Sequence, residues 1–102
     1  MDIKFIKDNG TTSSIVNLQI DTYLKVASSL GLEEIRIALR SKDVSPSEIK
    51  RRATSAAANY CLINIIMEYD LGDANGSVEK NRIAVNKALW DYFDRLFSYM
   101  EI

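Results

Sequence analysis

Residues 45–53 read Ser45-Pro46-Ser47-Glu48-Ile49-Lys50-Arg51-Arg52-Ala53. A serine that is followed directly by proline, and three residues later by glutamate, is typical of a helix start. The serine side chain can cap a free backbone N–H group, and proline already has the backbone angle that the first helical position needs. We therefore expect a helix to begin at Pro46, with Ser45 as its cap.

The apolar residues after this start recur at alternating intervals of four and three: Ile49, Ala53, Ala56, Tyr60, Ile63 and Met67. This spacing predicts a helix with one continuous apolar stripe. From Tyr60 onward the segment is apolar on nearly every side, so we expect it to be buried on most sides. A last helix is expected from Ser77 to about Met100, with a wide aromatic-rich face that includes Trp90, Phe93 and Phe97.

The N-terminal part of the chain favours strands before its first helix. Residues 3–7 are typical of a short strand, and Asn9-Gly10 supplies turn chemistry. Residues 16–20, Val16-Asn17-Leu18-Gln19-Ile20, alternate between apolar and polar side chains, as a half-buried strand does.

Asp21 is a good helix cap at the point where the apolar period lengthens. Leu24, Ala27 and Leu30 continue an apolar helical face. Residues 33–40 fit either a helix or a further strand, and we favour the helix.

Composition excludes several classes of function. A chain of 102 residues fits one domain, and its net charge of −1 argues against a strongly cationic coat for nucleic acid. The chain has no histidine and a single cysteine, so catalysis, a metal site or a cofactor is not expected. It has no signal peptide and no apolar run near the ~20 residues that span a bilayer, so we expect a soluble, cytoplasmic protein without a small-molecule substrate.

Residues 15–62 resemble the ribbon–helix–helix family of DNA-binding proteins. The resemblance rests on the alternating strand Val16–Ile20, the capped helix directly after it, and the helix start at Ser45. It implies a homodimer, or a higher even oligomer, in which two copies of the strand pair into a ribbon that enters the major groove of duplex DNA.

The chemistry of six residues suits such an interface. Asn17 and Gln19 are amides of the kind that bind adenine through two hydrogen bonds. The helix start at Ser45 and Ser47 presents free N–H groups that suit a phosphate, and Lys50 and Arg51 add positive charge there.

The expected fold class is mostly α with a short N-terminal β-ribbon, a ribbon–helix–helix-like core over residues 1–70 and a C-terminal oligomerisation helix over residues 77–101. The alternative is an α+β fold with a β-hairpin packed on helices. The leading functional hypothesis is a sequence-specific DNA-binding protein, acting as a transcriptional regulator or a plasmid or phage accessory factor. The competing hypotheses are a small protein-interaction module (an immunity protein, inhibitor or chaperone) and a structural subunit of a larger assembly.

Overall fold

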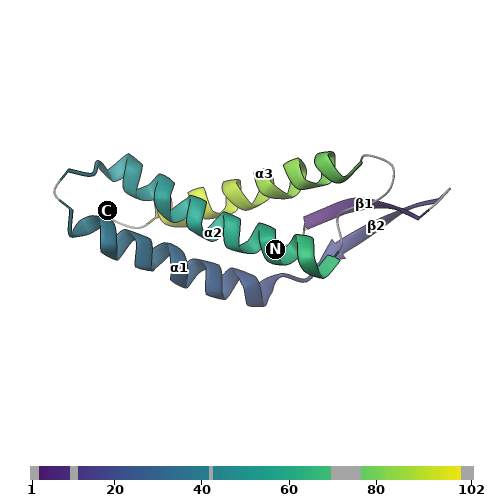
Figure 1. The fold of residues 1–102 in the computed structure, drawn as a ribbon, viewed down its shortest axis with the longest axis horizontal. Coiled ribbons are helices and arrows are strands. Elements are labelled where there is room, and N and C mark those ends of the chain that lie inside the picture. The colour runs from purple at the N-terminus through teal and green to yellow at the C-terminus, as the bar shows by residue number, and fades with distance from the viewer. Residues whose placement is uncertain (1–2, 10–11, 42, 70–76, 100–102) are drawn as a thin grey trace.

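The computed structural model of this chain describes residues 3–9, 12–41, 43–69 and 77–99. Its elements are, in chain order, β1 (Ile3–Asn9), β2 (Thr12–Leu18), α1 (Asp21–Leu39), α2 (Pro46–Tyr69) and α3 (Ser77–Ser98). Helices α1 and α2 run antiparallel to each other, and α3 packs mainly against α2 and passes behind it in Figure 1. The molecule is elongated, with extents of 55 Å by 22 Å by 19 Å.

The predicted start of α2 is confirmed. Pro46 is its first residue, and the backbone N–H of Glu48 donates to the Ser45 hydroxyl at 3.3 Å. The N–H of Ile49 donates to the Ser45 carbonyl at 3.0 Å. The Ser45 carbonyl thus accepts the first helical hydrogen bond, and the Ser45 side chain satisfies one of the donors that a helix start leaves without a helical partner.

The boundaries of α1 correct one prediction and confirm another. Ile20 rather than Asp21 occupies the cap position, and Ile20 provides no side-chain hydrogen bond there. Asp21 lies in the first turn, where its negative charge is favourable beside the positive end of the helix dipole. Residues 33–39 continue α1 as a helix, as we favoured, and Arg40 closes it.

The predicted fold class, with its β-ribbon and ribbon–helix–helix-like core, is wrong. Among residues 19–41, 43–68 and 82–99, whose side-chain burial the structure describes, the buried apolar side chains lie on the three helices and at Ile20, directly before α1. Strands β1 and β2 pair antiparallel inside one chain, from Ile3 opposite Leu18 to Asn9 opposite Thr12. The alternative of a β-hairpin packed on helices is also wrong as a description of the fold, because the helices pack chiefly on one another, while β1 contacts α3. The fold is a three-helix bundle.

Helices α1 and α3 meet in the core at a contact between Gly31 and Phe97. A Cβ atom placed on Gly31 would lie 2.1 Å from the Cζ atom of Phe97. Phe97 is fully buried and stacks on Phe93, with ring centroids 6.0 Å apart. The missing side chain of Gly31 therefore allows the end of α3 to approach α1. Helix α3 also contributes Val85 and Leu89 to this core, while its predicted role in oligomerisation stays a prediction.

Candidate functional site

The six residues predicted to contact DNA fall into two groups at opposite ends of the bundle. Asn17 lies in β2 and the exposed Gln19 follows it, just before α1 begins. Ser45, Ser47, Lys50 and Arg51 lie beyond the other end of α1, at the start of α2. With 19 residues α1 is about 28 Å long. Figure 1 accordingly shows β2 and the loop between α1 and α2 at opposite ends. A single copy does not bring the six residues together.

At the start of α2, two arginines converge on one carboxylate. The Nη2 and Nε atoms of Arg51 donate to the two oxygens of Glu48 at 2.7 and 2.9 Å, and Arg52 Nε donates at 3.2 Å. The hydrogen bonds from Arg51, followed by those from Arg52 and the charges of both, lower the pKa of Glu48 to about 2. The same pairing raises the pKa of Arg51. Arg51 is thus paired with a carboxylate on its own helix.

Lys50 is paired as well, but with α3. Its Nζ atom lies 3.3 Å from the Asp94 carboxylate and donates to the Ser98 hydroxyl at 3.2 Å. Exposed ion pairs of this kind are weak, so a phosphate could compete for these cations. The DNA-binding prediction therefore stays a prediction, although the described geometry does not assemble its residues.

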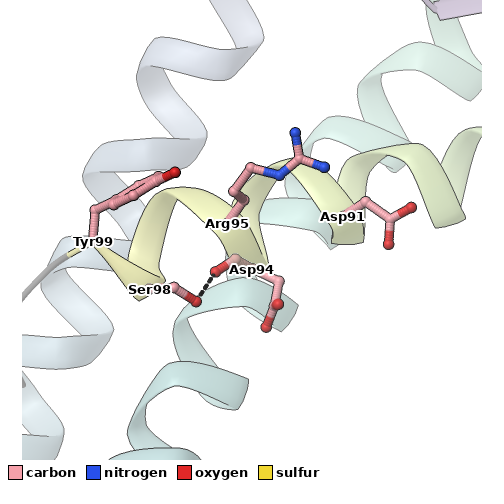
Figure 2. Close-up of a pocket in the computed structure, with 5 residues that line it drawn as sticks. All are labelled: Asp91, Asp94, Arg95, Ser98 and Tyr99. Carbon is pink, nitrogen blue, oxygen red and sulfur yellow. Dashed lines mark hydrogen bonds between the residues drawn. The ribbon is translucent and has the colours of Figure 1, made fainter.

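A shallow pocket of about 360 Å³ lies beside this contact, on the outer side of α3. It is lined by Asp91, Asp94, Arg95, Ser98 and Tyr99. Figure 2 shows the Arg95 guanidinium and the Asp94 carboxylate extending away from each other, rather than toward one ligand position. Within the described ranges no three His, Cys, Asp or Glu side chains are grouped to hold a metal ion. The pocket does not have the convergent polar groups of a small-molecule site.

One apolar surface feature lies on α1 and α2. On α1, Val26 and Leu30 are each 41% exposed and Ile37 is 53% exposed. On α2, Ile63 is 58% and Met67 77% exposed, and they continue a stripe whose earlier members Ala56 and Tyr60 are half-buried. We call these seven residues the α1–α2 face.

The two stripes share one spacing. On α1 the positions are 26, 30, 33 and 37, with Glu33 at the third, and on α2 they are 56, 60, 63 and 67. Both follow intervals of four, three and four, which is the spacing that helices use to pack side by side along their length.

Both stripes lie on the same side of the helix pair. Successive residues of a helix are turned by 100° around its axis. Around the axis of α1, the centre of the α1 stripe lies about 120° from Gly31, which contacts α3, and about 40° from Tyr23. The Tyr23 hydroxyl donates to Glu68 on α2, so the α1 stripe lies on the flank of α1 that carries this contact and is turned away from Gly31.

The buried side of α2 near its middle is marked by Ala57 and Cys61. Around the axis of α2, the α2 stripe lies about 110° from this buried side, in the same rotational sense as the α1 stripe lies from Gly31. Because α1 and α2 run antiparallel, turns in the same sense bring both stripes to the same side. In Figure 1 the C-terminal part of α3 passes behind α2.

This exposure overturns two expectations about the core. Leu30 was expected to continue the apolar face of Leu24 and Ala27, but Gly31 lies on the buried side of the helix and Leu30 is exposed. Ile63 and Met67 were expected to be buried on most sides, and they are among the most exposed apolar residues in the described chain. The sequence did indicate this exposure, because residues 60–67 are apolar on nearly every side. Two neighbouring helices cannot cover every side of a third helix, so some of these apolar side chains had to remain exposed.

Comparison with known proteins adds no relative. A scan against protein-family models, a search of curated proteins and a search of solved structures each found no match. In the ranges that the structure describes, no helix has both the length and the apolar character needed to cross a membrane.

Proposed function

We propose that this chain is a protein-interaction module that binds an apolar, helical surface through the α1–α2 face. The observation that carries the proposal is the exposure of five large aliphatic side chains at helix-packing intervals on two adjacent helices: Val26, Leu30, Ile37, Ile63 and Met67. Apolar side chains scattered singly over a surface are ordinary. A pair of parallel stripes with the spacing of a helix–helix interface is not, and such a surface marks a site of association.

The energy available at this face supports a specific interaction. Full burial of one aliphatic side chain contributes about 1.5–3 kcal/mol, so covering the half that is exposed contributes on the order of 1 kcal/mol each. Five such residues together give about 5 kcal/mol, to which the half-buried Tyr60 and its neighbours add. The cost of bringing two molecules together reduces this figure, so the partner must cover most of the face at once.

The chemistry of the chain fits binding better than catalysis. It contains no histidine. Its one thiol, Cys61, is buried, and burial raises the pKa of that thiol to about 11, so it is not a nucleophile near neutral pH. A free cysteine of this kind suits a reducing compartment, and we place the module in the cytoplasm.

Photo-crosslinking in producing cells tests the proposal. p-Benzoyl-phenylalanine would replace Ile63 or Leu30 on the face, and Lys87, an exposed residue of α3, as the control. We expect a discrete protein adduct from positions 63 and 30 and none from position 87. Equal labelling at all three positions, or none, would overturn the proposal. A crosslink from the start of α2 to duplex DNA, with none from the face, would favour the DNA-binding hypothesis instead.

A further inference from the structure

We infer that the partner that covers the α1–α2 face is a second copy of this chain, so that two helix pairs meet face to face. This inference rests on the proposed function, because it names the occupant of the same face.

The first argument is area. The 24 residues of α2 make a helix of about 36 Å, and two packed helices together are about 20 Å wide. A face of these dimensions covers about 700 Å², close to the roughly 800 Å² that each partner contributes to a standard stable protein interface. The face is therefore large enough for a dimer without help from any other surface.

The second argument is shape. The radius of gyration is 15.5 Å, whereas a compact domain of about 100 residues has a value near 13 Å. A single copy is a long, rod-like body in which α3 packs against α2 and the α1–α2 face remains exposed. Apposing two copies at this face places α3 of each copy on the outside and doubles the thickness of the body.

The third argument is self-complementarity. A two-fold interface needs a surface that matches itself after a rotation of 180°. Two antiparallel helices with stripes of identical spacing meet that need, because the rotation lays each stripe over another with the same intervals. The small side chain of Ala56 leaves a recess in one stripe, and large side chains such as Leu30 and Ile37 project from the other. This alternation is what knobs-into-holes packing requires.

Sedimentation equilibrium of the purified full chain tests the inference. We expect the wild type to sediment at twice its 11.5 kDa mass in the micromolar range, and to dissociate on dilution. Ile63→Asp should raise the dissociation constant at least tenfold. Ile83→Asp is the matched control, because Ile83 is 60% exposed on α3, outside the face, and should leave the dimer intact.

Thermal melting followed by circular dichroism checks that both aspartate variants are folded. Because both isoleucines are exposed, neither substitution should unfold the bundle. A wild type that stays monomeric at several hundred micromolar would overturn the inference. So would a dimer that Ile63→Asp leaves intact. If the chain is monomeric but position 63 still crosslinks to a different protein in cells, the interaction module stands and only the second copy fails. If position 63 crosslinks to nothing, both fail.

Discussion

Gly31 is the residue on which the approach of α3 to α1 depends. We expect Gly31→Ala to lower the free energy of unfolding by about 1–3 kcal/mol, because the new methyl overlaps the buried ring of Phe97. This loss exceeds the roughly 1 kcal/mol that alanine gains over glycine in a helix interior. Urea unfolding measures it, with the exposed Ser29→Ala in the same helix as the control. An unchanged or increased stability of Gly31→Ala would contradict the close contact.

Thr54 is buried with no hydrogen-bond partner for its hydroxyl among the described residues. Thr54→Val keeps the shape of the side chain and removes the unsatisfied oxygen, so we expect the free energy of unfolding to rise by about 1 kcal/mol. The same change at the exposed Thr22 is the control, and it should alter stability by less than about 0.5 kcal/mol. A loss of stability in Thr54→Val would show that the hydroxyl has a partner after all.

Glu48 predicts a pH dependence of stability. Its pKa is about 2 in the folded chain, below the ordinary value of 4.5, chiefly because Arg51 donates to it. A depressed carboxyl pKa stabilises the fold above the unfolded-state value, and this contribution is lost as pH falls from about 4.5 to 2. The difference in melting temperature between wild type and Glu48→Gln should therefore shrink across that window. A constant difference from pH 6 to pH 2 would contradict the pairing.

At the scale of single elements, the start of α2 is the most clearly encoded feature. Ser45→Ala removes the acceptor for the Glu48 N–H and should cost about 1 kcal/mol of unfolding free energy. Ser47→Ala lies in the first turn, and its hydroxyl contacts only Ser45 among the described residues, so a smaller effect is expected. Thermal unfolding compares the two variants. Equal losses would mean that Ser45 does not act as the cap.

The elements that could be predicted from the sequence are those specified by neighbouring residues. The serine and proline at 45 and 46 are adjacent to the helix that they start, and the helix over residues 33–39 follows from its local composition. Asp21 failed as a cap because the helix begins one residue earlier than the change of period indicates. The ribbon failed because a strand pattern does not say which strand it pairs with, and residues 12–18 pair with residues 3–9.

The candidate site was harder to predict, because the exposure of a stripe depends on how the helices pack and not on the sequence of one helix. The intervals of four and three along α2 indicate an apolar stripe, but not whether this chain has an element to cover it. Ile49 and Ala53 at the start of the stripe are buried, whereas Ile63 and Met67 at its end are exposed. Only the arrangement of all three helices reveals that difference.

At the scale of the whole molecule, the open side of the α1–α2 pair is the feature that connects fold to function. Helix α3 packs against α2 and reaches α1 at Gly31, while the apolar residues of the α1–α2 face remain exposed. A partner on that side would complete a core that this chain builds only in part. The central claim is therefore that the α1–α2 face is covered when the protein works.

Hydroxyl-radical footprinting tests this claim most directly, with Met67 on the face and Tyr99, which directly follows α3, as paired reporters in one molecule. Both side chains are highly exposed in the isolated chain, at 77% and 82%. We predict that Met67 is oxidised several-fold more slowly in producing cells than in a dilute purified sample, while Tyr99 reacts equally in both. Equal oxidation of Met67 in the two samples would contradict the account.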